Sequence, residues 1–189
     1  MILAALVLLG GSISPARAAL DLNVSDDAFR LAGNGSLSRL LPDANGVYDV
    51  GLIYHNEDDD RDATAVHLGA LVTGEAGSGD VNVTAGLGLR AQYLSLEHDE
   101  GGGAALGGQF DVRFPGYDRI SLAGYGYVQP GILSLGDVDR QTEWAASIGY
   151  EVLRDATAYV GYRQLRASLD DTDSFTVDDG WHVGLRLNF

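Results

Sequence analysis

Hydrophobic and polar residues alternate with a period of two along most of the chain after residue 19. Between residues 81 and 93 the odd positions are apolar or aromatic, and the even positions are Asn, Thr, Gly, Arg and Gln. Successive side chains of a strand point to opposite faces, so this pattern predicts strands whose two faces meet different surroundings. No stretch shows a convincing helical period, which predicts an all-β chain. The same alternation recurs at residues 48–54, 66–73, 106–114, 143–152, 158–163 and 181–189, and residues 120–129 form a further strand with unresolved faces.

The number of strands depends on how the first segment is read. From residue 47 onward there are eight strands, so the chain starts and ends on the same side. Before it, Leu20, Leu22 and Val24 occupy even positions, whereas Phe29 and Leu31 occupy odd ones. This change of parity predicts a tight hairpin, because a single fused strand would give an odd total, which single-chain bacterial barrels avoid. We expect a closed antiparallel up-and-down β-barrel of 8 to 10 strands, with ten favoured because an unpaired hairpin would leave backbone donors exposed.

The connections between the strands also alternate, in charge and in length. Acidic connections are expected at residues 56–62, 97–103, 130–140 and 168–179, and short or small ones at 74–79, 115–118 and 154–155. The four acidic connections hold fifteen of the 27 carboxylates. Acid-rich loops at one end and tight turns at the other are typical of a transmembrane barrel with outer loops and periplasmic turns.

A soluble β-sandwich or lipocalin-like barrel would also alternate, but with its apolar face turned inward. Here the polar faces carry Gly beside Arg, Glu, Gln and His, which suits a narrow lumen, while the apolar faces carry Leu, Val, Tyr and Trp, which suits lipid. We therefore expect a membrane barrel. Aromatic residues near the strand ends are expected to form two interfacial girdles, namely Tyr48, Tyr54, Phe114, Trp144, Tyr162, Trp181 and Phe189.

The first 18 residues have the composition of an export signal. Residues 2–9 are almost entirely apolar, and Ala16, Arg17 and Ala18 form a small-x-small cleavage triplet. A membrane-spanning helix needs about 20 apolar residues, so this shorter core predicts a cleaved signal peptide over residues 1–18. The mature domain is expected to cover residues 19–189, to be exported by the Sec route and to reside in the Gram-negative outer membrane.

Composition excludes several other classes of function. The 12 basic residues, all Arg, and 27 acidic residues give a net charge of −15. Such an acidic chain is not expected to bind nucleic acid, whose phosphates need a basic surface. The absence of Cys excludes disulfides, a thiol nucleophile and cysteine-based zinc sites. No cofactor is expected.

The last strand ends on an aromatic residue with apolar residues at alternate positions. Trp181, Leu185, Leu187 and Phe189 resemble the terminal signal by which outer-membrane barrels are recognised by their assembly machinery. Residues 19–27, 52–58, 158–163 and 179–185 resemble segments of the YfaZ-type outer-membrane proteins. The resemblance implies a small outer-membrane barrel in contact with membrane lipid and lipopolysaccharide, and it implies no assigned activity.

Charged residues on the polar faces are the main candidates for a functional site. In a narrow lumen each charge must find a partner. A network of ion pairs that fills and rigidifies the barrel is one hypothesis, and a gate that opens a narrow path for small solutes is the other. The residues expected in this network are Asp49, Arg90, Asp111, Arg113, Glu143, Glu151, Arg163 and Arg186.

Acid–base catalysis has four histidine candidates, His55, His67, His98 and His182. Outer-membrane lipid deacylases resemble one another in placing Ser two residues after His, but here Gly69 and Gly184 occupy those positions. We expect a non-enzymatic structural or surface-interaction protein. The alternatives are a narrow, cation-preferring channel and, third, an outer-membrane hydrolase.

Two aspartate clusters, at residues 58–60 and 170–173, are candidates for holding Ca²⁺ or Mg²⁺. Such ions could bridge these loops to anionic lipopolysaccharide. Neither has the spacing of an EF-hand loop, so solvated and mutually repelling loops are the alternative. If divalent ions bridge these loops, a chelator should lower the melting temperature of the protein in lipopolysaccharide-containing vesicles. Identical melting with and without chelator would contradict the bridging hypothesis.

Overall fold

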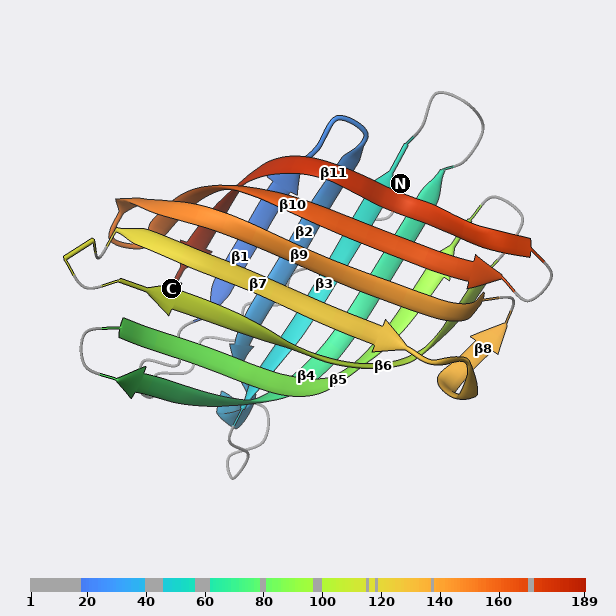
Figure 1. Ribbon diagram of the computed structural model, residues 1–189, viewed down its shortest axis with the longest axis horizontal. Helices are drawn as coiled ribbons and strands as arrows, with labels where there is room; N and C mark the ends of the chain where they lie inside the picture. The colour runs from blue at the N-terminus through green and yellow to red at the C-terminus, as the bar shows by residue number, and fades with distance from the viewer. Residues whose placement is uncertain are drawn as a thin grey trace.

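The computed structural model (Figure 1) describes residues 18–39, 46–56, 62–78, 81–96, 100–114, 116–117, 119–136, 138–169 and 172–189. Residues 1–17 of the expected signal segment lie outside the described residues. The strands are β1 (Ala19–Val24), β2 (Ala28–Ser36), β3 (Val47–His55), β4 (Ala63–Ser78), β5 (Val81–Ser95), β6 (Glu100–Arg113), β7 (Ile120–Gln129), β8 (Ser134–Gly136), β9 (Val138–Leu153), β10 (Ala156–Leu169) and β11 (Thr172–Asn188). Two single turns of 3₁₀-helix, η1 (Leu37–Arg39) and η2 (Gly131–Leu133), interrupt them.

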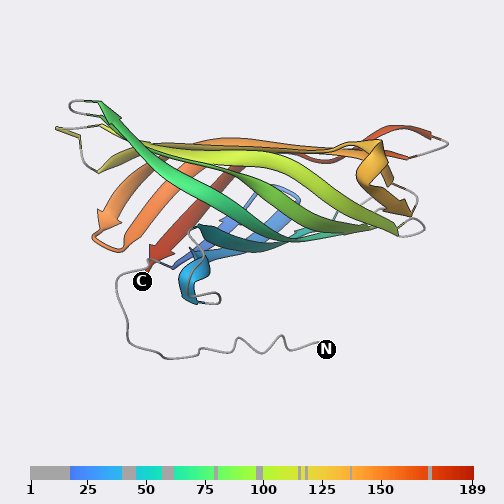
Figure 2. The same ribbon diagram turned by 90° about the horizontal axis from the view of Figure 1, so that it is seen from below.

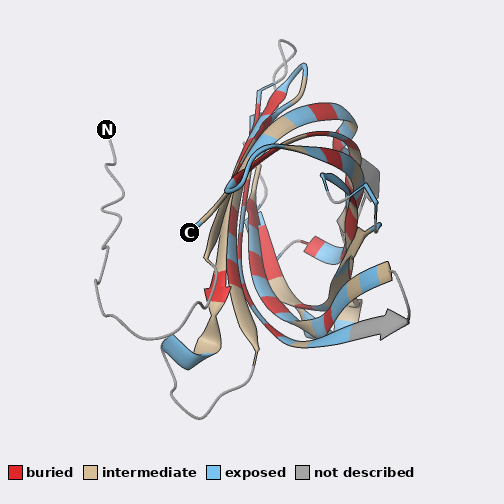
Figure 3. Cartoon of the chain, turned by 90° about the vertical axis from the view of Figure 1, so that its left-hand side faces the viewer, coloured by how far each residue is buried: buried red, intermediate tan, exposed pale blue. Residues whose placement is uncertain are grey.

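Ten of the eleven described strands close into a single antiparallel barrel (Figure 3). Neighbours in the barrel are neighbours in the chain, β5 pairs with β6, and β11 returns to pair with β1. The exception among the described strands is β8, which adds three residue pairs beside β6. No helix among the described residues is long and apolar enough to cross a membrane. The expectation of a closed barrel, with ten strands favoured over eight, is confirmed.

The first hairpin completes the barrel wall. β1 pairs with β11 on one side and with β2 on the other, and β2 pairs with β3. The hairpin turns at Ser25, whose backbone N–H donates to Ala28 at 2.8 Å and whose hydroxyl accepts from the Ala28 N–H at 3.1 Å. The parity change in the sequence marks this turn, because Val24 and Phe29 both lie exposed on the outside.

The apolar faces point outward, as the alternation predicts. Leu87 is 76% exposed, Ile148 59% and Leu185 37%. Buried and exposed residues alternate along much of the wall, for example in the second half of β5 (Figure 3). In residues 120–129 the inward face carries Tyr125 and Tyr127. Because aromatic side chains lie on the inward face, the hydropathy pattern could not distinguish the inward from the outward face of this strand.

The expected connections were wrong in extent. Residues 168–179 were expected to form the longest loop, but β10 runs to Leu169 and β11 begins at Thr172, so most of this segment is paired strand. β6 likewise begins at Glu100, β4 continues to Ser78, and the 130–140 segment contains η2 and β8. An alternating pattern of apolar residues arises only where one face of a strand meets an apolar environment. Backbone hydrogen bonding between strands needs only a partner strand. The paired strands therefore extend beyond the residues that show the alternating pattern.

The two ends of the barrel differ in charge. We define the terminal end as the one where Ala18 and Phe189 meet, and the loop end as the opposite one, where β8 lies (Figures 1 and 2). Connections at the loop end contain twelve carboxylates, whereas those at the terminal end contain four. The negative charge of the chain is therefore concentrated at the loop end.

The seam between β1 and β11 can be tested with cysteines, because the native chain has none. Leu22 and Leu185 are paired across the seam, and paired Cα atoms lie within the separation that a disulfide bridges. Oxidation of the Leu22→Cys/Leu185→Cys variant should give an intramolecular disulfide, detected by a gel shift that reductant reverses.

The matched control is Leu20→Cys/Val183→Cys, which is four residues out of register, or about 13 Å along the strand. This pair should stay reduced. Equal cross-linking of both variants would contradict the register of the seam.

Candidate functional site

Apolar side chains pack against one another inside the barrel near its loop end. We call the eight residues named at the end of this paragraph the loop-end apolar cluster. Leu96 packs against this cluster. Leu94 and Leu165 are fully buried, and Ile53 is 2% exposed, so neither outside solvent nor lumen water reaches them. The members come from β3, β4, β5, β9, β10 and β11 and lie toward the loop ends of those strands: Ile53, Ala63, Ala65, Leu94, Val138, Leu165, Ala167 and Val177.

This cluster was missed by sequence reasoning, which expected a polar lumen throughout. The available signal was the interruption of alternation at strand ends, where Ile53 follows Leu52 and Leu94 follows Tyr93. Two consecutive apolar residues place one of them inside the barrel. The inward side chains are therefore apolar near the loop end and polar further in.

A layer of amide hydrogen bonds lies next to the cluster. Gln92 donates to the Gln129 side chain at 2.9 Å, and Gln129 donates in turn to the Ser134 hydroxyl at 3.0 Å. Gln129 also donates to the Gly102 carbonyl at 3.2 Å. Because Ser134 belongs to β8, this layer ties the short strand to the lumen.

Arg90 lies at the centre of the lumen and is 3% exposed. Its Nη2 lies 2.5 Å from the Asp49 carboxylate, and its Nη1 lies 3.5 Å from Glu143. The guanidinium also stacks on the ring of Tyr127, 3.5 Å from the ring centroid. Two carboxylates and an aromatic face therefore surround one buried cation, which offsets the cost of removing it from water.

Gly69 makes this ion pair possible. It lies on β4, directly between Asp49 on β3 and Arg90 on β5 in the strand register. A Cβ atom on Gly69 would collide with the Asp49 carboxylate and the Arg90 stem. The glycine lets two long side chains on flanking strands meet across the strand between them.

A second chain of ion pairs runs toward the terminal end. Arg186 Nε lies 3.1 Å from Asp21, and Arg113 Nη1 lies 3.2 Å from Glu151. Asp111 links the two arginines, at 3.9 Å from Arg186 and 3.5 Å from Arg113. The carboxylates at this end are therefore shared between arginines rather than held by one each.

Asp21 is the most heavily bonded carboxylate of this second chain. It accepts hydrogen bonds from Tyr159 at 2.5 Å and from Asn23 at 3.1 Å, and Arg30 approaches it at 3.5 Å. The ring of Tyr125 lies 5.4 Å from Arg30 and 5.3 Å from Arg90, which connects the second chain to the Arg90 cluster.

Arg163 is 1% exposed and forms a third cluster. Its Nε donates to Asp178, and its Nη1 donates to the Asn23 side chain at 2.8 Å. Asp178 lies in the part of β11 that was expected to be loop, which is why sequence reasoning missed it. Asp21 and Arg30 were not among the expected network residues, because only the apolar positions of the first hairpin entered the prediction.

All eight residues expected in the lumen network face the lumen and lie within ion-pair distance of an opposite charge. The partner of Arg163 is Asp178, which was not among the eight. Trp181, Leu185 and Leu187 of the expected assembly signal lie on the outer face of β11, and Phe189 is the residue after this strand, 73% exposed. Their role in assembly stays a prediction.

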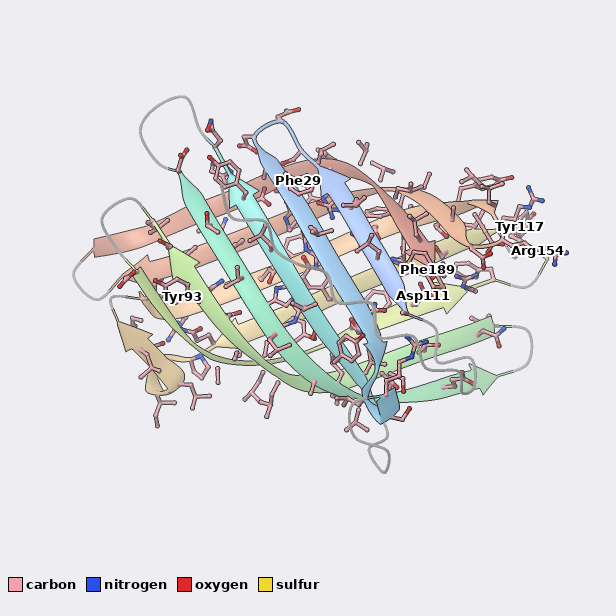
Figure 4. The ribbon with its side chains drawn as sticks, turned by 180° about the vertical axis from the view of Figure 1, so that it is seen from behind. Phe29, Tyr93, Asp111, Tyr117, Arg154 and Phe189 are labelled. Carbon is pink, nitrogen blue, oxygen red and sulfur yellow. The ribbon has the colours of Figure 1, made fainter. Side chains whose placement is uncertain are left out.

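A cavity of about 340 Å³ occupies the terminal half of the lumen. Its wall includes Asn34 and Asn188 beside the chain termini, and it ends at the buried side chains of Arg30, Arg90 and Arg163. Figure 4 labels Asp111, another wall residue, near Phe189 at this end of the barrel. None of the loop-end apolar cluster lines the cavity.

The histidines do not gather into one site. His55 lies 3.8 Å from Asp27 at the loop end, His67 lies 3.2 Å from Asp49, and the His182 ring packs edge-on against Tyr159. His98 lies outside the described residues. Among the described residues, no three His, Cys, Asp or Glu side chains are grouped to hold a metal ion. Most of the two aspartate clusters also falls outside the described residues.

A family model described as "YfaZ precursor" matches residues 41–189. The chain belongs to the YfaZ family. The match covers every strand of this YfaZ-family chain from β3 to β11. A search of curated proteins gives no match for it.

Solved structures similar to this YfaZ-family chain include a NanC porin, with 10% identity and a TM-score of 0.42 over 92% of this chain and 100% of the other. A KdgM porin has 11% identity and a TM-score of 0.37 over 92% and 99%. A major outer membrane protein from Thermus thermophilus has 11% identity and a TM-score of 0.34 over 93% and 100%.

Removing the central cation should destabilise the barrel strongly. Arg90→Met leaves Asp49 and Glu143 buried without this arginine, so the free energy of unfolding should fall by about 3–5 kcal/mol. Urea unfolding in detergent micelles, followed by the fluorescence of Trp144 and Trp181, measures the loss.

The matched control is Arg113→Met in the same lumen. The Arg113 side chain is 39% exposed, so solvent screens its ion pairs and the loss should be below about 1 kcal/mol. Equal losses for the two variants would show that burial does not set the importance of these pairs.

Proposed function

We propose that this YfaZ-family chain is an outer-membrane barrel with a closed lumen, which presents acidic loops at the cell surface in a structural or surface-interaction role. The observation that carries the proposal is the loop-end apolar cluster, whose large members are 0–2% exposed inside the barrel. A dry apolar layer across a narrow lumen opposes the passage of hydrated ions. The proposal includes no catalytic role.

The outer surface supports a membrane location. Large apolar side chains such as Leu68, Val72 and Leu87 are each more than 60% exposed, which water-soluble proteins avoid over wide areas. On β11 the stretch from Trp181 to Phe189 is about 26 Å long, or about 20 Å along the axis at a strand tilt of about 40°. This is close to the apolar band of about 25 Å that outer-membrane barrels present.

Aromatic residues near the middle of β9, β10 and β11 support a boundary with water on the loop-end side of the apolar stretch. Trp144, Tyr162 and Trp181 stack on three neighbouring strands, with ring centroids 5.6 and 5.7 Å apart. The hydroxyl of Tyr162 donates to Asp179, and that of Tyr93 donates to Glu100 at 2.5 Å. Figure 4 labels Tyr93 at this end. The rings therefore lie on the apolar surface while their polar tips reach carboxylates.

The charge distribution supports an orientation with the loop end outside. Twelve carboxylates in the loop-end connections would face the anionic lipopolysaccharide, with divalent cations between the two layers. The termini would then lie in the periplasm, as in other outer-membrane barrels. The family description, "YfaZ precursor", supports export and removal of a signal segment.

A narrow, cation-preferring channel is the second candidate. The cavity of about 340 Å³ favours it, because half of the lumen is already open to the terminal end. Conduction would require the loop-end apolar cluster to part.

Conductance across a planar bilayer separates these two functions. Purified wild-type protein should insert without discrete current steps. Leu94→Gly/Leu165→Gly removes two large side chains from the loop-end apolar cluster and should allow small steps.

The control for this experiment is Leu87→Gly/Leu89→Gly, which removes two leucines from the outer face of β5 and should stay silent. Discrete, cation-selective steps from the wild-type protein would replace the closed-barrel proposal with the channel.

A further inference from the structure

A groove of about 570 Å³ crosses the outer face of the barrel from β1 to β5, and we call it the outer groove. These five strands lie in front in Figure 4. The large aliphatic side chains of the groove belong to two neighbouring rows of the strand register. One row contains Leu20, Val50 and Leu68, and the next contains Leu31, Leu52 and Val66.

The floor of the outer groove is backbone. His67 and Gln92 line the groove from positions between the two rows, yet they are only 7% and 8% exposed. Their side chains face the lumen, where His67 lies 3.2 Å from Asp49 and Gln92 donates to Gln129. Both residues therefore border the groove through main-chain atoms, and the groove runs across the strands between the rows.

The lining of the outer groove favours an apolar occupant. No Arg, Asp or Glu is among the residues that line it in the described part of the chain. Gly33 and Ala91 lie in the same row as Leu68 and leave the groove open, since a Cβ atom on Gly33 would meet no atom nearer than 3.7 Å. A polar ligand would find main-chain groups already paired between strands, whereas an apolar one would bury its surface.

The dimensions of the outer groove suit one acyl chain. The groove crosses five strands, about 19 Å at the usual strand spacing. It runs perpendicular to strands that tilt by about 40°, so it covers about 12 Å along the barrel axis. Half of the hydrocarbon core of a bilayer measures about 15 Å. A chain that lies aslant in the groove therefore stays within one leaflet, which suits the short strands β1 and β2.

A second copy of the chain fits the outer groove poorly. Thirteen residues line the groove, whereas a stable protein interface takes about 20–30 residues on each side. In a two-fold dimer the same patch meets itself, and two hollows placed face to face leave a gap. A flexible lipid chain fills a hollow without such a constraint.

The position of the outer groove favours phospholipid over lipopolysaccharide. Leu20 is the second residue of β1, close to the junction of Ala18 and Phe189, so the groove begins near the terminal end. In the proposed orientation this end faces the periplasm, where the leaflet consists of phospholipid. The phosphates of lipopolysaccharide would find no arginine among the residues that line the groove.

We propose that the outer groove binds one acyl chain of a phospholipid from the leaflet at the terminal end. The inference rests on the proposed membrane location and adds to it a specific lipid site on the barrel wall.

Native mass spectrometry of the full-length barrel in detergent micelles tests the site, with phosphatidylethanolamine and lipopolysaccharide titrated separately. The wild-type barrel should bind one phosphatidylethanolamine per chain saturably, and lipopolysaccharide should bind more weakly. The same spectra show whether the chain is a monomer, so a second copy in the groove would be detected as a dimer.

Gly33→Leu fills the outer groove without removing a hydrogen bond or a charge. The affinity for phosphatidylethanolamine should fall by about tenfold or more, because the leucine displaces about two methylene groups of the bound chain. Ala91→Leu fills the groove on β5 and should weaken binding in the same way.

The matched control is Gly126→Leu on β7, outside the outer groove. Gly126 is also an outward-facing strand glycine, paired with the exposed Trp144, and a Cβ atom there meets no atom nearer than 3.9 Å. This variant should bind phosphatidylethanolamine within about twofold of wild type.

The proposal is overturned if the wild type binds no lipid saturably, or if Gly33→Leu and Ala91→Leu both bind as the wild type does. It is also overturned if lipopolysaccharide binds more tightly, or if the wild type forms a dimer that Gly33→Leu abolishes. Flotation with phospholipid vesicles reports separately on the membrane location. A barrel that floats but lacks the saturable lipid contradicts the outer groove alone, whereas a barrel that does not float contradicts the membrane location itself.

Discussion

Pairing of buried charge across intervening strands is the constraint on which this barrel depends. Arg90 and Arg163 are buried almost completely inside the barrel, so each of these arginines must find a carboxylate partner. Arg90 reaches Asp49 only because Gly69 leaves the space between them empty. A glycine on the inward face thus permits this ion pair, and the ion pair offsets the cost of burying the two charges inside the barrel.

The same constraint divides the lumen into two halves of different character. Near the loop end the wall closes on Leu94, Leu165 and Val177, and the loop-end apolar cluster contains no charged residue. Toward the terminal end the polar side chains separate around a cavity, and arginines share carboxylates instead of pairing one to one. One barrel therefore holds an apolar end and a polar end within the same lumen.

The fold was largely predictable because the period of two is imposed by lipid on every membrane-facing strand. The hairpin at Ser25 was visible in the parity of five apolar residues. Strand ends were not predictable, because paired strands that extend beyond the lipid show no pattern in hydropathy. For this reason Asp178 was assigned to a loop and not to the lumen network. The eight expected lumen residues followed from face assignment alone. The choice of Asp178 for Arg163 depends instead on the register of β10 and β11, which pairs Leu165 with Asp178 and which no local pattern encodes.

The height of the wall is uneven around the barrel. β1, β2 and β3 contain 6, 9 and 9 residues, whereas β4, β5, β9, β10 and β11 contain 14–17. A six-residue strand is about 20 Å long before any tilt, so the wall is lowest at β1. In the proposed membrane location, hydrophobic mismatch at β1 would be relieved by local thinning of the bilayer or by tilting of the barrel. The bilayer is therefore expected to be thinner beside β1 than beside the long strands.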